Sequence, residues 1–255
     1  MTSRERIYKT MKGKPTDRIP VSLWQHFPDA DQTSQGLADS ILNFQKKFNF
    51  DLVKVTPASG YMTEAFGGKF IPLKTGLQKG IRECVDFPIK NHNDWKKIKP
   101  ASINQGILKR ELEALKLIKK GIGNDVPIVQ TIPNPLTLAK TIRGKLLFDD
   151  LRNHPNDLKS ALDVITDTIL TFSLESLKVR ADGIFFFTQM ASFDFLTEKE
   201  YQEFGVKYDL QILNNLAKQN ALLILHIHGL NIMFDLLKEY PVQIINWHDQ
   251  LTAPT

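Results

Sequence analysis

Amphipathic helices and short apolar runs alternate along this chain, and that rhythm limits the folds open to it. A 3.6-residue spacing of apolar side chains predicts helices at 36–48, 105–120, 156–180 and 198–218. Between them lie apolar runs typical of buried strands, at 18–27, 50–60, 126–135, 182–190, 221–229 and 242–249. Strands that alternate with helices in this way are usually parallel and joined by right-handed crossovers. We therefore predict an α/β fold with about six βα units.

The turn after the first predicted strand favours one α/β architecture over another. It reads "WQHFPDADQ" and has no glycine, whereas an open doubly wound sheet usually has a glycine-rich phosphate turn there. The predicted strands end in residues whose side chains can bind a ligand or take part in catalysis, as the strands do at the active face of a barrel. In chain order these residues are Trp24, His26, Thr56, Ser59, Thr131, Asn134, Thr188, Gln189, His226, His228, Asn246, His248 and Asp249.

The fold class expected is thus a TIM (β/α)₈ barrel, formed as one domain over 1–255. Glycines and prolines at 61–101 punctuate short extended pieces, which we interpret as an excursion of one or two hairpins within that domain. The chain ends just after the sixth predicted strand. About six βα units are then present, and the last two of the barrel are expected to be missing.

Composition excludes several classes of protein. The chain has a single cysteine, Cys84, so an internal disulfide framework is excluded and a reducing cytoplasm is the expected location. The net charge of +5 is spread along the chain, which favours a solvated surface over a nucleic-acid site. No apolar run reaches the roughly 20 residues of a membrane helix. We expect neither nucleic acid nor membrane as a partner, and a homodimer stays open.

The segment "ALLILHIHGL" (221–230) raises the question of a metal site, because two histidines interrupt an apolar run. Side chains two residues apart on a strand point to the same side, so His226 and His228 converge. Such a pair can offer two nitrogen ligands to a metal ion. Two hydrogen-bonded histidines in a polar barrel mouth would have the same pattern.

The order of several motifs resembles the uroporphyrinogen decarboxylase superfamily, which also includes cobalamin-dependent methyltransferases that use zinc to activate a thiol. The matching pieces are "RERIYKTMKGKPTDRIPV", "FDLVKVTPASGYMTEAFGG", "ADGIFFFTQM", "FLTEKEYQEF" and "HIHG". The resemblance implies a barrel with its active site at the carboxyl ends of the strands. It covers nearly all of the chain.

The decarboxylase branch of this family implies residues that the chain lacks. Its members grip the carboxylates of the tetrapyrrole with arginines in a loop after the first strand, and this chain has "WQHFPDAD" there. Trp24 and His26 could instead line a pocket for a planar ligand. Such a decarboxylase would need no cofactor.

The methyltransferase branch resembles the chain more closely. Its His-x-Cys zinc motif at the end of the fifth strand corresponds to His226-x-His228, and imidazole nitrogen also suits zinc. Glu64 stands where that branch tends to have an acidic residue near the metal. His248 and Asp249 end the neighbouring strand and could serve as catalytic groups, ligands or supports for a ligand.

The preferred hypothesis is a zinc-assisted methyltransferase-like enzyme working with a corrinoid partner. In it, His226 and His228 hold the metal, while Glu64, His248 and Asp249 are the catalytic candidates. The substrate-binding candidates are Trp24, His26, Thr56, Thr188, Gln189 and Asn246. The alternatives are uroporphyrinogen decarboxylase, with a tetrapyrrole as substrate, an inactive truncated barrel, and a protein that only binds a tetrapyrrole.

Overall fold

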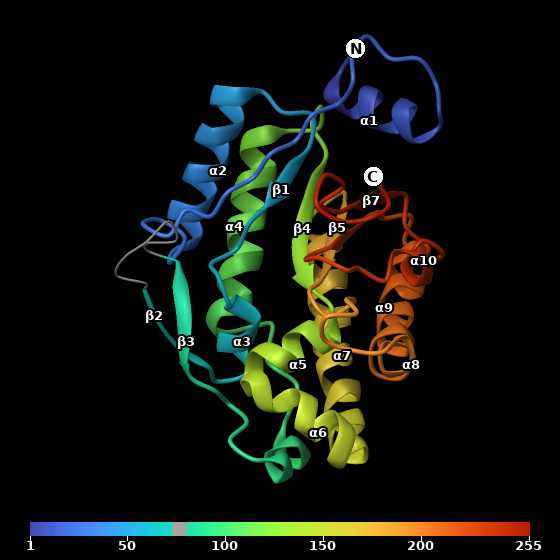
Figure 1. The fold of residues 1–255 in the computed structure, drawn as a ribbon. Coiled ribbons are helices and arrows are strands. Elements are labelled where there is room, and N and C mark those ends of the chain that lie inside the picture. Colours follow the sequence, from blue (N-terminus) through green and yellow to red (C-terminus); the bar gives the residue numbers. More distant parts are fainter. Residues whose placement is uncertain (73–80) are drawn as a thin grey trace.

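The fold is built on a parallel sheet covered by helices, as a computed structural model shows for residues 1–72 and 81–255 (Figure 1). The strands lie in the order β1-β4-β5-β6-β7, and each neighbouring pair is parallel. They are β1 (Val53–Val55), β4 (Ile128–Pro133), β5 (Gly183–Thr188), β6 (Leu222–Ile227) and β7 (Ile244–Asn246). The α/β class with a parallel sheet is confirmed.

The helices fill the connections between these strands. They are α1 (Ser3–Met11), α2 (Ser34–Phe48), α3 (Tyr61–Ala65), α4 (Gly106–Ile122), α5 (Pro135–Arg143), α6 (Leu147–Asn153), α7 (Pro155–Lys178), α8 (Glu198–Tyr201), α9 (Lys207–Ala217) and α10 (Phe234–Leu237). The short turns η1 (His92–Lys97) and η2 (Gly144–Leu146) are 3₁₀ helices, and η3 (Gln202–Val206) is a π-helical turn between α8 and α9. None of the helices in the described ranges is long and apolar enough to cross a membrane.

The two-residue period of the strands divides their side chains between two environments. In β6, Leu223 and Leu225 belong to the large core packed against the helices. Leu222 and Ile224 point the other way and pack with Phe185 in a smaller cluster. His226 has the same parity as Ile224, so the backbone directs it away from the helices and toward the inner side of the sheet.

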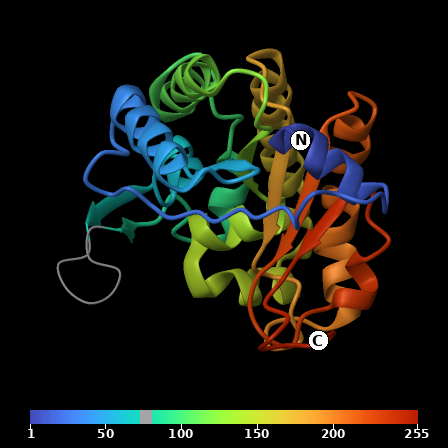
Figure 2. The ribbon, with the colours of Figure 1, turned by 90° about the horizontal axis from the view of Figure 1, so that it is seen from above.

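The prediction of a strand at 18–27 is wrong. This segment runs across the molecule without regular secondary structure (Figure 2). Its backbone is held beside the start of β1 by the Asp51 amide, which donates to the carbonyl of Val21. The amide of Val21 in turn donates to the Asp51 side chain, so a carboxylate takes the place of a backbone acceptor there.

The remaining elements agree with the sequence to different degrees. The helices expected at 36–48, 105–120 and 156–180 correspond to α2, α4 and α7, and the capping box of Thr197 and Glu200 opens α8. The helix expected at 198–218 is interrupted by η3. There a Cβ on Gly205 would lie 2.7 Å from the Tyr201 ring, so glycine lets that ring pack against the backbone. The sequence analysis missed α5 and α6.

The region 61–101 contains α3, one antiparallel pair and η1. Strands β2 (Lys69–Pro72) and β3 (Arg82–Asp86) pair through residues such as Phe70 and Cys84. The part of the predicted excursion at 73–80 lies outside the described residues. The pair lies beside α3, and it supplies one wall of the cavity described below (Figure 1).

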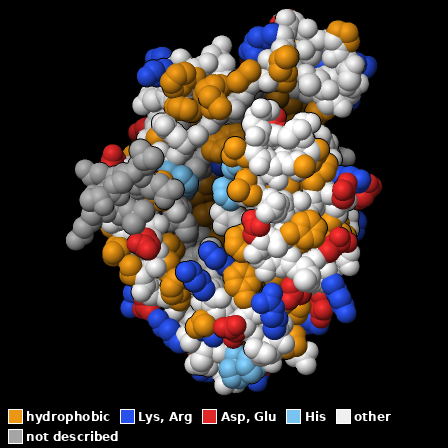
Figure 3. All heavy atoms as spheres, in the orientation of Figure 1, with side chains coloured by type: hydrophobic (Ala, Val, Ile, Leu, Met, Phe, Trp, Pro, Cys, Tyr) orange, Lys and Arg blue, Asp and Glu red, His pale blue; other side chains and the backbone are white. Residues whose placement is uncertain are grey.

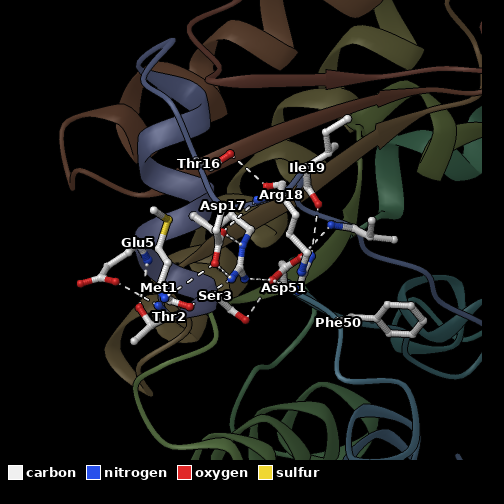
Figure 4. A network of polar contacts seen from close by, with 12 residues as sticks. Met1, Thr2, Ser3, Glu5, Thr16, Asp17, Arg18, Ile19, Phe50 and Asp51 are labelled. Carbon is white, nitrogen blue, oxygen red and sulfur yellow. Dashed lines mark hydrogen bonds and ion pairs between the residues drawn. The ribbon is translucent and has the colours of Figure 1, made fainter.

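A buried carboxylate, Asp51, ties the N-terminal segments to the sheet (Figure 4). It accepts hydrogen bonds from Arg6 at 2.5 Å, from Arg18 at 2.5 and 3.0 Å, from the Ser3 hydroxyl at 3.0 Å and from the Val21 amide at 2.8 Å. Arg6 also donates two hydrogen bonds to Asp17, at 2.7 and 2.8 Å. Unlike Asp51, Asp17 has a side chain that is 45% exposed. The network anchors α1 and the irregular segment before α2.

A second buried acid gives the fold a specific pH dependence. Glu111 on α4 is fully buried, and burial raises its pKa from 4.5 to about 7. The folded state therefore binds this proton more tightly than the unfolded state does. Between pH 4.5 and about 7, rising pH takes the proton from the unfolded chain first, so the free energy of unfolding falls.

We expect Glu111→Gln to remove this loss. From pH 4.5 to pH 7.5, the free energy of unfolding of the wild type should fall by on the order of 3 kcal/mol relative to that of the variant. The reason is that the glutamine amide of the variant cannot ionise. Urea unfolding of both proteins at several pH values measures the difference. Parallel stability curves across that range would contradict the assignment.

Candidate active site

A cavity of about 1060 Å³ opens at the carboxyl ends of the strands. That volume suits a cofactor-sized ligand. The space-filling view shows a hollow in the middle of one face, with histidine side chains at its edge (Figure 3). The walls come from strand ends, from α3, from the β2–β3 pair, and from α5 with η2.

Six of the residues singled out from the sequence line this one cavity. They are Trp24, His26, Thr56, Gln189, His226 and His228. Trp24 comes from the irregular segment 18–27, which was expected to be a strand. Its ring packs edge-on against the rings of Phe185 and His226, with centroid distances of 5.2 and 6.5 Å. The backbone amide of Gln189 donates to the Thr137 hydroxyl on α5 at 2.9 Å. Residues from distant parts of the sequence thus meet at one opening.

Three histidines gather at the ends of β6 and β7. One nitrogen from each of His226, His228 and His248 lies within 4.8 Å of the others. The ring centroids are 5.7 Å apart for His226 and His228, and 5.1 Å apart for His228 and His248. β6 and β7 are parallel neighbours, so their carboxyl ends bring the three imidazoles together. Three imidazole nitrogens with an open side are a donor set found in catalytic zinc sites.

Asn246 orients the first of these rings. Its side-chain oxygen lies 2.6 Å from Nδ1 of His226 and pairs with it across adjacent strands. Burial lowers the pKa of His226 to about 4, so the ring is neutral at physiological pH. With Nδ1–H donated to Asn246, Nε2 keeps its lone pair for a ligand or a metal ion.

Other predicted site residues lie elsewhere. Glu64 on α3 forms an ion pair with Arg82 of β3. Thr188 is fully buried and has no surface on the cavity; its hydroxyl lies 3.1 Å from the Tyr201 hydroxyl, which donates to the buried Asp209. Asp249 is exposed and accepts from its neighbour Gln250. The geometry brings none of these three to the histidine cluster.

The sequence analysis missed Lys54, which faces the cavity from β1. Its side chain is only 9% exposed. The signal was present in "LVKV", where a lysine interrupts a strand that is otherwise apolar. Arg82 and Arg143 also line the cavity, and each is held by a carboxylate, Glu64 and Asp150 respectively.

Comparison with known proteins identifies the family. The model of the uroporphyrinogen decarboxylase family matches residues 2–253. The chain belongs to the uroporphyrinogen decarboxylase family. The resemblance noted from the sequence is therefore confirmed, and the relatives within this enzyme family include methyltransferases as well as decarboxylases.

Relatives on the methyltransferase side include the methylcobamide:CoM methyltransferase MtbA of Methanosarcina acetivorans. It is 24% identical over 241 residues, which span 89% of this chain and 70% of the relative. The methylcobamide:CoM methyltransferase MtaA of Methanosarcina barkeri is 22% identical over 242 residues, with the same two coverages, 89% and 70%. Among the decarboxylase relatives, a uroporphyrinogen decarboxylase of Geotalea daltonii is 23% identical, and the match covers 94% of this chain and 75% of the relative.

A solved structure shares the fold. A methyltransferase from Methanosarcina mazei superposes with a TM-score of 0.81 at 21% identity, covering 96% of this chain and 75% of the other. The likeness extends over nearly the whole chain. At this identity it establishes a common fold.

Proposed function

We propose that this protein is a zinc-dependent methyltransferase of the uroporphyrinogen decarboxylase family that moves a methyl group from a corrinoid to a thiol. The observation that carries the proposal is the cluster of His226, His228 and His248, of which His226 and His228 line the cavity. We further propose that the parallel sheet belongs to a (β/α)₈ barrel, whose carboxyl-terminal face is the active face. The named methyltransferase relatives support methyl transfer.

The donor set fits zinc. Zinc accepts imidazole nitrogen, and its catalytic sites usually have three protein ligands and one open position. His226 meets the requirement for a neutral ligand, because its pKa is about 4. Asn246 supplies the partner on the other ring nitrogen that metal-binding histidines generally have. When bound, zinc would lower the pKa of a thiol ligand and thereby supply a thiolate nucleophile at neutral pH.

The residues of this chain position the reaction. The three histidines would hold the zinc, which would bind the sulfur of the acceptor. Trp24 and Phe185 cover the inner side of His226. The attacking sulfur forms the new carbon–sulfur bond as the cobalt–carbon bond of the methylcorrinoid breaks. The electron pair of that bond stays with cobalt, and the thiol proton leaves to solvent.

Uroporphyrinogen decarboxylation has less support in this geometry. A substrate with several carboxylates needs bidentate cations. The two arginines that line the described part of the cavity, Arg82 and Arg143, already pair with carboxylates of the chain. The histidine cluster would also have no part in a reaction that needs no metal.

Metal content tests the proposed function. Purified protein loaded with zinc and then desalted should contain about one zinc per chain, and His226→Ala and His228→Ala should lose it. The second group of histidines at His92 and His154 offers a matched control, because it lies elsewhere on the protein. His154→Ala should keep the zinc. Retention of zinc by all three variants would refute the site.

Asn246→Ala should weaken zinc binding without abolishing it. The lost hydrogen bond frees the His226 ring to rotate and to change tautomer, and such changes typically cost about 10–100-fold in metal affinity. Competition with a chromophoric chelator measures the change. Asn215→Ala, which changes a half-buried residue of α9, is the control and should bind zinc as the wild type does. Equal affinity in both variants would contradict the role of Asn246.

A further inference from the structure

Lys54 is a buried amine with no acidic partner in the part of the chain that the structure describes. Among the described residues no carboxylate approaches it, and its polar neighbour is the Thr56 hydroxyl at 3.5 Å. Its Nζ lies over the rings of Phe185 and Trp24, at 4.7 and 5.0 Å from their centroids. Burial alone lowers its pKa from 10.5 to about 7. A buried cation without a counter-charge is costly, and proteins seldom retain one in a well-packed site.

The position of Lys54 gives this amine access to a ligand. It lies on β1 between Val53 and Val55, which pack toward α2 and α4, so its side chain points to the inner side of the sheet. There it lines the same cavity as His226. Phe185 links the two, since its ring stacks on His226 at 5.5 Å and lies under the Lys54 amine.

The charges around the cavity favour an anion. In the described part of the wall the basic residues are Lys54, Arg82, Lys140, Arg143 and Lys145, and the acidic residue is Glu83. The two arginines are neutralised by Glu64 and Asp150. Besides burial, the positive charge of Lys54 helps to lower the pKa of two nearby bases, His26 and His226, and the carboxylate of Asp31 acts on His26 in the opposite direction. Among the described residues, no carboxylate contacts the buried amine and competes with an incoming anion for it.

We propose that Lys54 binds the oxyanion of a small organic acid, whose planar or apolar part lies against Trp24 and Phe185. The ammonium group donates to the oxyanion, and the two aromatic faces exclude water from the pair. The proposal deepens the proposed function by placing an acidic ligand beside the histidine cluster. The interaction itself does not need a metal, so it can be tested separately.

Benzoate is the probe, because it joins one carboxylate to a planar apolar body. In EDTA-treated protein, calorimetry should show benzoate binding at least about tenfold more tightly than the neutral isostere benzamide. Lys54→Met should reduce this preference to about twofold or less, whereas Lys54→Arg, which keeps the charge, should retain most of it. Lys97→Met, which removes an exposed lysine outside the cavity wall, should bind benzoate within about twofold of the wild type. Benzenesulfonate in place of benzoate shows whether the site prefers carboxylates or sulfonates.

Thermal unfolding separates ligand binding from a structural role. Methionine fills similar space without a charge to bury, so Lys54→Met should be at least as stable as the wild type. A lysine retained for its contacts with the aromatic rings would instead make the variant less stable. Equal binding of benzoate and benzamide, or undiminished benzoate binding by Lys54→Met, would overturn the proposal. Failure of the zinc test would leave these results unchanged.

Discussion

Replacing Asp51 by alanine should destabilise the fold by about 3–5 kcal/mol, the range measured when one partner of a buried ion pair is removed. The carboxylate is fully buried and accepts from two arginines, a serine hydroxyl and a backbone amide. In the variant, Arg6 keeps Asp17, but it loses its buried partner, and the Val21 amide loses its acceptor. Urea unfolding followed by circular dichroism measures the change.

Asp17→Ala is the control for this prediction. Asp17 binds the same arginine as Asp51, but its side chain is 45% exposed, so solvent screens the pair. Its removal should therefore cost much less stability than the removal of Asp51. Equal effects of the two substitutions would mean that the network in Figure 4 does not depend on the buried carboxylate.

His248→Ala should reduce zinc affinity by more than about 100-fold, a larger effect than loss of a supporting hydrogen bond produces. His248 follows β7, and its ring lies 5.9 Å from His226 and 5.1 Å from His228, centroid to centroid. Without it the site has two protein nitrogens, too few for the usual catalytic zinc site. Chelator competition measures the affinity.

Cobalt substitution gives this prediction a second readout. The visible spectrum of cobalt(II) reports its coordination, so the wild-type spectrum should change in His248→Ala. Asp249→Ala is the matched control, because Asp249 is adjacent in sequence but exposed and paired with Gln250. Unchanged zinc affinity in His248→Ala would exclude His248 as the third ligand.

Strand periodicity accounts for what the sequence could predict. The two-residue spacing of His226 and His228 placed both on one side of a strand, and the parallel sheet then brought His248 to them from the next strand. The helices α2, α4 and α7 were predictable because their apolar residues repeat every 3.6 residues. These features depend on local pattern and on one general rule of sheet topology.

Other features depend on contacts that no local pattern reports. The segment 18–27 has the composition of a strand, but its Val21 amide is taken by the Asp51 carboxylate, 30 residues away. Glu64 matched an acidic position of the family, yet Arg82 from β3 pairs with it. Lys54 was visible as a lysine within an apolar strand, but only the assembled cavity shows that no carboxylate of the described residues contacts it.

Methyl transfer to a thiol is the most direct test of the central claim. Zinc-loaded protein is mixed with methylcobalamin and 2-mercaptoethanesulfonate, and the loss of methylcobalamin absorbance is followed while mass spectrometry detects the methyl thioether. The proposed function predicts a rate well above that of the uncatalysed mixture, lost in His228→Ala. A zinc-loaded wild type that forms thioether no faster than His228→Ala would contradict it.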